Sequence, residues 1–391
     1  MQTVQEMKLN LGPQHPSTHG VMKLEVVLDG EYIVDVKPVI GQLHRGIEKM
    51  AEGMLYQQFI PLTDRLDYLS GPANNLSYCL AVEKLMGVEA PERGKYVRVI
   101  VTELARIANH LVALGVWGLD MGAWTIMLYT FRDREMVLDL FEMFCGQRIT
   151  TNCFRIGGST YDFPEGFTGK LEEFLEIFPA RVDDYETLLT KNPIWMTRLK
   201  DVGKVSAQDA VAYGLTGPNL RASGVKWDLR KVCPYEVYDR LEFEIPVGSN
   251  GDCFDRYYVR IQEMRQCVRI IKQALEQLPP GPTMVDLPAI ALPDKTVFPN
   301  NFPQVVRHFH LLVQGFAPPP GEEIYLGFEN PKGELGFYIV SDGSGYPYRL
   351  KIRSPSFINL QIMSQIMKGA LLADVIAILA SFDPVLGEID R

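Results

Sequence analysis

The sequence predicts an α+β protein that is predominantly helical, and three observations lead to this prediction. Near the start, residues 22–28 alternate apolar and polar side chains and are followed by Asp29-Gly30, a pair typical of tight hairpin turns. A long apolar stripe at helical spacing then runs from Val97 to Leu114. Strand-like segments return within residues 324–352, after a stretch rich in proline.

The N-terminal residues predict a small β element, in which residues 22–28 and 32–36 form the two strands of a hairpin. Pro91 stands where the helix with the apolar stripe begins, because proline is well tolerated in the first turn of a helix. Further helices are expected over residues 70–86, 123–144, 170–189 and 252–278, the last ended by the prolines of residues 279–282.

Residues 279–321 are rich in proline and asparagine, and they predict a surface connection. The strand-like segments beyond it are residues 324–328, 335–340 and 348–352, with a turn at 342–345. We therefore expect a single large domain over residues 1–391. It would be divided into an N-terminal β element (9–40), a helical core (43–278), the connecting segment (279–321) and a C-terminal β unit with a closing helix (322–391).

Composition limits the classes of function. With 391 residues and 47% hydrophobic content, the chain is globular and long enough to bury a large core. Its formal net charge of -9 argues against nucleic acid as a partner, because phosphate binding needs clustered Lys and Arg. The apolar residues 371–379 include Asp374 and are too short to cross a bilayer. Since no signal-peptide pattern opens the chain, we expect a cytosolic location.

The cysteines are scattered along the chain, and no two of them have the C-x-x-C spacing that is typical of zinc or iron–sulfur sites. They are Cys79, Cys145, Cys153, Cys233, Cys253 and Cys267. We therefore predict no metal site and no cofactor ligated by this chain.

Residues 12–20 place His15 and His19 among prolines and glycines, which predicts an ordered loop without regular secondary structure. A histidine held in such a loop is a candidate proton donor near neutral pH. The alternative is that both histidines only hold the loop together through hydrogen bonds. We interpret His15 as structural.

Six segments then form one ordered series along the chain: residues 12–20, 43–49, 64–68, 154–158, 220–224 and 387–391. This series closely resembles the quinone-site subunit of proton-pumping NADH:quinone oxidoreductase, respiratory complex I, from about Leu9 to the last residue. The resemblance implies an oxidoreductase subunit that is active only within the complex. It also implies a peripheral position at the cytoplasmic face of the cell membrane.

That family is similar to the large subunit of nickel–iron hydrogenases, which implies the same fold here. Hydrogenases hold nickel on four thiolates, because soft sulfur ligands suit that metal. The corresponding positions in this chain look like Asp67, Ser70, Val385 and Glu388. Nickel chemistry is therefore excluded, because the thiolate ligands are missing. The cavity that would have held the metal becomes available for another electron acceptor.

The resemblance implies that the quinone headgroup, a substrate, binds between His19 and Tyr68, at the start of the first core helix. A phenol and an imidazole suit this role, since quinone reduction adds two protons as well as two electrons. Asp120 looks like the carboxylate partner that orients the histidine. Taken alone, Tyr68 reads as a half-buried aromatic residue and Asp120 as a helix cap.

The family places Arg45 beside the terminal [4Fe-4S] cluster of the neighbouring small iron–sulfur subunit, and Arg65 is a second candidate for that position. A guanidinium there would stabilise added negative charge on the cluster. The alternative is a buried salt bridge to Glu48 or Asp67. Thr150 departs from the family, whose members commonly carry a histidine at this point, and a threonine cannot titrate near pH 7.

Further implied partners are the other peripheral-arm subunits and the membrane subunit of the quinone channel. Two alternatives to the quinone-reducing NADH enzyme stay open. One is a non-catalytic docking scaffold derived from a hydrogenase large subunit, and the other is a related complex whose donor is ferredoxin or a deazaflavin. The sequence leaves ubiquinone and menaquinone equally open. Asp390-Arg391, at the last positions of the sequence, are expected to lie tucked near the cavity.

Overall fold

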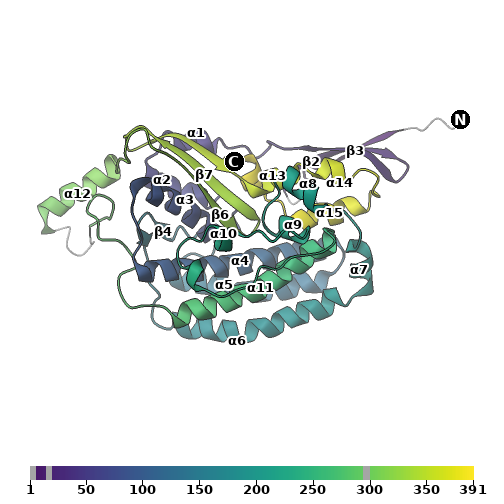
Figure 1. Ribbon diagram of the computed structural model, residues 1–391, viewed down its shortest axis with the longest axis horizontal. Coiled ribbons are helices and arrows are strands. Elements are labelled where there is room, and N and C mark those ends of the chain that lie inside the picture. Colours follow the sequence, from purple (N-terminus) through teal and green to yellow (C-terminus); the bar gives the residue numbers. More distant parts are fainter. Residues whose placement is uncertain (1–5, 15–19, 294–299) are drawn as a thin grey trace.

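A computed structural model describes residues 6–14, 20–293 and 300–391. The N-terminal strands β1 (Met7–Leu11), β2 (Lys23–Asp29) and β3 (Tyr32–Val39) form an antiparallel sheet in the order β1-β2-β3, at the upper right of Figure 1. Every second residue of β2 is buried, which is the alternation that the sequence shows. The predicted hairpin is confirmed, and β1 is a third strand that the sequence pattern did not predict.

The five long helices are α3 (Gly71–Met86), α4 (Glu92–Asp120), α5 (Trp124–Cys145), α6 (Phe167–Tyr185) and α11 (Cys253–Glu276). In Figure 1, α4, α5, α6 and α11 form the layer below the sheets, and α3 lies above them, against β6 and β7. The predicted helices are confirmed to within a few residues. The one beginning at residue 170 differs most, because α6 begins at Phe167 and gives way after Tyr185 to the π-helical turn η2 (Glu186–Thr190).

Helix α4 lies at the centre of this layer, in contact with α3, α5 and α11. By length and composition it could cross a membrane, and it is the one such helix in the described part of the chain. However, 89% of its most apolar window is buried inside the fold. We therefore interpret α4 as the buried core helix of this layer.

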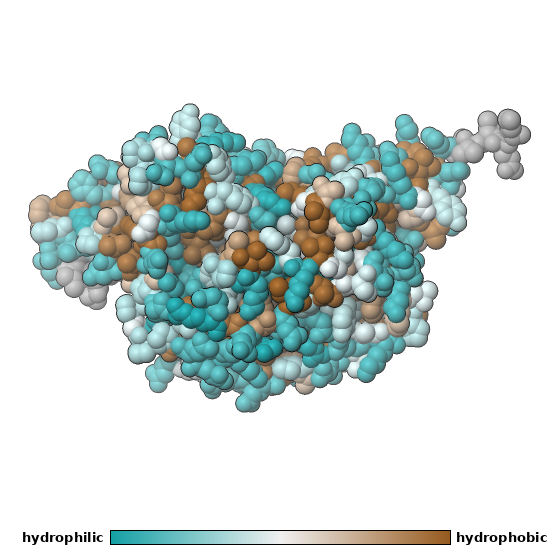
Figure 2. All heavy atoms as spheres, viewed as in Figure 1, coloured by the Kyte–Doolittle hydropathy of each residue, from teal (hydrophilic) through white to brown (hydrophobic). Residues whose placement is uncertain are grey.

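Short elements connect the long helices. They are α1 (Ile47–Ala51), α2 (Tyr56–Thr63), β4 (Phe154–Arg155), β5 (Gly158–Ser159), α7 (Pro193–Leu199), α8 (Ala207–Ala212), α9 (Gly217–Ala222), α10 (Leu229–Val232) and η3 (Tyr238–Arg240). None of them was predicted, since one or two turns give too few residues for a periodic pattern. Figure 2 shows mainly hydrophilic residues over α6 and α11, and more hydrophobic ones around α12 and the C-terminal helices.

The C-terminal strands β6 (Glu323–Asn330), β7 (Gly333–Ser341) and β8 (Pro347–Arg353) form a second antiparallel sheet, which packs on α3. This confirms the three predicted strands. The chain then forms α13 (Pro355–Leu360), α14 (Met363–Ile366), α15 (Asp374–Phe382) and α16 (Leu386–Asp390), where one closing helix was expected. Helix α12 (Phe302–Val313) lies within the segment that was predicted to be a plain connection. The division into four units stays a prediction.

Candidate functional site

Tyr68 lies in the connection between α2 and α3, and 41% of its surface is exposed. Its ring rests against Gly387 in α16, where an added Cβ would lie 3.3 Å from Tyr68 Cδ1 and 2.5 Å from the carbonyl oxygen of Leu66. A glycine is therefore required at position 387, because the backbone of Leu66 and the Tyr68 ring lie too close for a side chain. Helix α16 thus contacts the candidate phenol directly.

Replacing Gly387 by alanine should displace the Tyr68 ring and destabilise the fold by about 1–3 kcal/mol, because the methyl group would overlap backbone atoms. Thermal denaturation and the quinone-reduction rate of the assembled complex measure the two effects. Gly169→Ala in α6 is the control, since no atom lies within 4 Å of its Cβ position. Equal behaviour of both variants would contradict the contact.

The predicted donor His19 lies outside the described residues, as does His15. The next described residue is Gly20, whose φ of 137° favours glycine. A Cβ on Gly20 would lie 2.7 Å from Leu386 Cδ1. Leu386 and Gly387, neighbours in α16, therefore contact Gly20 and the Tyr68 ring respectively.

Asp120 is the last residue of α4 and is half-buried. Its alternative reading as a helix cap is wrong, because Ala123 is the residue that precedes the first turn of α5.

Arg45 and Arg65 lie together beside Tyr68. The Arg45 Nη2 group donates to the carbonyl oxygens of Arg65, at 2.9 Å, and Gly387, at 2.7 Å. Arg65 donates to the carbonyl oxygen of Pro61 at 2.5 Å, and its side chain stays 46% exposed.

Among the described residues, neither arginine pairs with the carboxylates of the salt-bridge alternative. Glu48 accepts from Lys351 at 3.1 Å, and Asp67 accepts from Asn109 at 2.7 Å. The nearest acid to Arg65 is Asp64, at 3.7 Å. The two guanidinium groups are thus held by carbonyl oxygens, and the nearest negative charges are Asp64 for Arg65 and Asp390 for Arg45.

Asp64 is a site residue that the sequence analysis missed. Its side chain is fully buried, and burial raises its pKa to about 6, although Arg65 opposes this shift. It lies beside Gly71, the first residue of α3. Thr150, where members of the family commonly carry a histidine, has a positive φ of 54°, which is uncommon for a residue with a side chain.

The last residues of α16 close over the same region. The Asp390 carboxylate accepts from the backbone N–H groups of Gly41, at 2.8 Å, and Leu43, at 2.7 Å. Arg391 donates to the carbonyl oxygen of Ile352 at 2.8 Å. Asp390 is thus buried and Arg391 partly buried, and together they hold the segment that carries Arg45, whose backbone N–H donates to Arg391. That they line a cavity stays a prediction.

A buried polar cluster lies behind Tyr68, built from Asp67, Asn109, Lys332 and Asp383. The Asn109 side chain links it, because its Nδ2 donates to Asp67 at 2.7 Å and its Oδ1 accepts from Lys332 at 3.1 Å. Lys332 also forms an ion pair with Asp383. Burial raises the pKa of Asp67, while the nearby lysine opposes the rise.

Glu388 borders this cluster from α16 and is fully buried. Its Oε1 accepts from the backbone N–H of Ser356 at 3.1 Å, and its Oε2 has no hydrogen-bond partner among the described residues. Burial and the neighbouring Asp67 carboxylate raise the pKa of Glu388 to about 8. A carboxyl of this kind is protonated at neutral pH.

The four positions compared with nickel ligands are all buried: Asp67, Ser70, Val385 and Glu388. They come from the connection before α3 and from the C-terminal segment. Across residues 6–14, 20–293 and 300–391, no group of three or more His, Cys, Asp or Glu could hold a metal ion.

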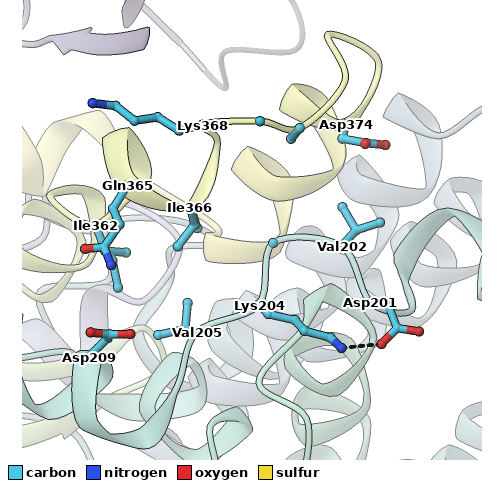
Figure 3. Close-up of a pocket in the computed structure, with 13 residues that line it drawn as sticks. Asp201, Val202, Lys204, Val205, Asp209, Ile362, Gln365, Ile366, Lys368 and Asp374 are labelled. Atoms are coloured by element: carbon cyan, nitrogen blue, oxygen red, sulfur yellow. Dashed lines mark ion pairs between the residues drawn. The ribbon is translucent and has the colours of Figure 1, made fainter. Parts of the chain in front are cut away.

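A separate pocket of about 420 Å³ lies between residues 201–209 and the helices α14 and α15 (Figure 3). Its lining includes Asp201, Asp209, Asp374, Lys204 and Lys368, and it contains none of the predicted site residues. A wall with this many charges does not suit an isoprenoid quinone, so the candidate site remains the region around Tyr68.

Comparison with known proteins agrees with the resemblance. Residues 120–391 match the family model of the respiratory-chain NADH dehydrogenase 49 kDa subunit. The chain is 54% identical, over the full length of both proteins, to the D-type subunit of NADH-quinone oxidoreductase from Geotalea uraniireducens. It is 53% identical to the second D-type subunit of Rhizobium meliloti, with 99% of this chain and 96% of the relative covered.

A third relative is the D-type subunit from Methylacidiphilum infernorum, which is 56% identical over 98% of this chain and 91% of its own length. Such identity over complete chains establishes the family. The chain therefore belongs to the family of D-type, or 49 kDa, subunits of NADH-quinone oxidoreductase, respiratory complex I, and is part of that enzyme complex together with the complex's other subunits.

Proposed function

We propose that this chain forms the quinone-reduction pocket of the complex, next to the terminal [4Fe-4S] cluster of the small iron–sulfur subunit, and that membrane subunits couple the reaction to proton translocation. The observation that carries the proposal is the meeting of three features at α16. Gly387 supports the Tyr68 ring and accepts a hydrogen bond from Arg45, and Leu386 contacts Gly20, the residue that follows His19 in the sequence.

Quinone reduction needs a proton donor at each carbonyl oxygen. A phenol is protonated at neutral pH, and burial raises the pKa of Tyr68 further. The Tyr68 hydroxyl can therefore donate a proton. His19 would donate from the opposite side, with Asp120 orienting its ring and favouring the imidazolium. The proposal therefore assigns one donor to each oxygen of the headgroup.

Arg45 and Arg65 would face the partner's cluster, whose added electron they stabilise by charge. Their bonds to carbonyl oxygens hold the two guanidinium groups in place without neutralising them. The fold would be that of a hydrogenase large subunit which has lost its metal ligands. The chain would sit on the cytoplasmic face of the membrane, against the subunit that forms the quinone channel.

Replacing His19 by alanine tests the proposal. Loss of a positioned proton donor to the headgroup should slow quinone reduction by about 100-fold. Reduction of the cluster by NADH, followed separately by its spectroscopic signal, should keep its rate. If cluster reduction slows and quinol formation does not, His19 lies outside the acceptor site. If neither changes, His19 is not a proton donor to the quinone, and a docking scaffold becomes the better reading only if Tyr68→Phe also keeps the normal rate.

A further inference from the structure

We propose that Asp67 and Glu388, buried on the inner side of Tyr68, share one exchangeable proton and return it to Tyr68 after the phenol has protonated the quinone. This inference rests on the proposed function and adds a second pair of residues to it. Asp67 directly precedes Tyr68 in the chain, and Glu388 directly follows the glycine on which the Tyr68 ring rests.

The balance of charge in the cluster favours a shared proton. Three carboxyl groups, Asp67, Asp383 and Glu388, lie around one lysine, Lys332. The lysine is committed by its ion pair to Asp383. Isolated carboxylates are too costly to bury without compensation, so the excess of acids is relieved by keeping a proton.

Hydrogen bonds divide the pair unequally. Asp67 accepts from Asn109 and from the backbone N–H of Leu69, at 2.7 and 3.1 Å. Glu388 accepts from the backbone N–H of Ser356, while its second oxygen has no partner among the described residues. An oxygen left without a donor is the natural place for a proton, so Glu388 carries it in the resting state.

The groups that face the pair come from several elements. Lys332 approaches from the β6–β7 turn, and Asp383 from the end of α15. Behind Asp383 lies Arg260 of α11, whose guanidinium donates to the carbonyl oxygen of Ser381 at 2.8 Å. Because Arg260 acts on Asp383 as well, it adds a second positive charge near the cluster, which lowers the cost of the negative charge that the pair gains when its proton leaves.

Successive proton transfers make up the proposed step. The Tyr68 O–H bond breaks as its proton bonds to the oxygen of the reduced quinone, whose electrons come from the partner's cluster. The O–H bond of Glu388 then breaks as its proton bonds to Asp67, the neighbour of both groups, and the proton passes from Asp67 to the tyrosinate, which restores the Tyr68 hydroxyl. Burial raises the pKa of the Tyr68 phenol, which makes the tyrosinate a stronger base than a carboxylate, so the proton moves from the pair to the tyrosinate. A proton from solvent later refills the pair.

The test is Glu388→Gln in the assembled complex, with quinone reduction followed from about pH 7 to about pH 9. In the wild type the rate should fall as pH rises through about 8, because Glu388 is protonated below its pKa and ionised above it. The variant should be several-fold slower at neutral pH and should lose this alkaline limb. Glu388→Asp, which keeps a titratable group, should restore a limb.

Glu236→Gln is the matched control. Glu236 is also buried, its pKa is raised to about 7, and it pairs with Arg98 at 2.8 Å, outside the cluster. It should leave the pH profile unchanged. A Glu388→Gln complex that keeps both the wild-type rate and the alkaline limb would overturn the inference. The proposed function would survive that result if Tyr68→Phe still abolished quinone reduction.

Infrared difference spectra of the wild-type complex provide a second readout, which does not depend on a variant that folds. Quinone reduction should bleach a protonated-carboxyl C=O band that shifts in heavy water. Absence of such a band would also overturn the inference, because no buried carboxyl would then release a proton during turnover.

Discussion

Replacing Tyr68 by phenylalanine should slow quinone reduction in the assembled complex by at least about 100-fold, while NADH still reduces the partner's cluster at its normal rate. The substitution removes the phenolic proton and keeps the ring that packs on Gly387. Loss of a positioned general acid costs about 100-fold or more, whereas ring packing sets the stability of the site. The two rates, measured on the same preparation, separate chemistry from assembly.

Tyr325→Phe is the control for this prediction. Tyr325 is 46% exposed, close to the 41% of Tyr68, but its hydroxyl donates to Glu334 on the C-terminal sheet at 2.5 Å. The rate of quinone reduction should not change in this variant. A Tyr68→Phe complex with a normal rate would show that the quinone takes its proton elsewhere.

The sequence predicted the long helices because burial of one face repeats along them. Helix α4 has 29 residues, enough for its apolar stripe to dominate any local exception. Helix α12 escaped prediction because Pro303 and the asparagines before it are typical of loops, although proline in a first turn is compatible with a helix. Its residues contact little of the core, and only Leu311 is buried.

The exposed rim of the site was predictable, and its interior was not. Tyr68, Arg45 and Arg65 lie in motifs whose order along the chain carries the resemblance. Lys332 stands in a two-residue turn between strands, a context in which lysine is normally exposed, yet it is 1% exposed here. Its burial depends on α4 and α15 closing around the turn, which no local pattern encodes.

Asp64 illustrates the same limit. It belongs to a recognised motif, but its neighbour Arg65 invites the reading of a surface ion pair. The structure buries the carboxylate completely and leaves the arginine partly exposed, at 3.7 Å. Which of two adjacent charges turns inward is decided by the packing of α3 against the motif, and Gly71 leaves room there for the buried acid.

Replacing Arg221 by methionine should destabilise the protein by about 3–5 kcal/mol, because the change strands buried carboxylates. Arg221 is fully buried in α9. It donates to Glu263 at 2.7 Å and to Glu329 at 2.8 Å, and Asp228 lies 3.7 Å away. The positive charge of Arg221 holds the pKa of Glu263 well below its usual range. Thermal unfolding of the complex, and the amount assembled in membranes, measure the loss.

Arg148→Met provides a matched comparison, since Arg148 also lies among three carboxylates: Glu135, Asp139 and Glu142. These groups are all exposed to solvent, where screening makes an ion pair weak, so this variant should unfold at the temperature of the wild type. Arg221→Lys should fall between the two, because lysine keeps the charge but cannot reproduce the forked contacts to two acids. If Arg221→Met were as stable as Arg148→Met, the buried ions would not be what holds α9, α11 and β6 together. Since β6 leads directly into the turn that carries Lys332, the ionic network beneath the site and the proton chemistry proposed above it depend on the same packing.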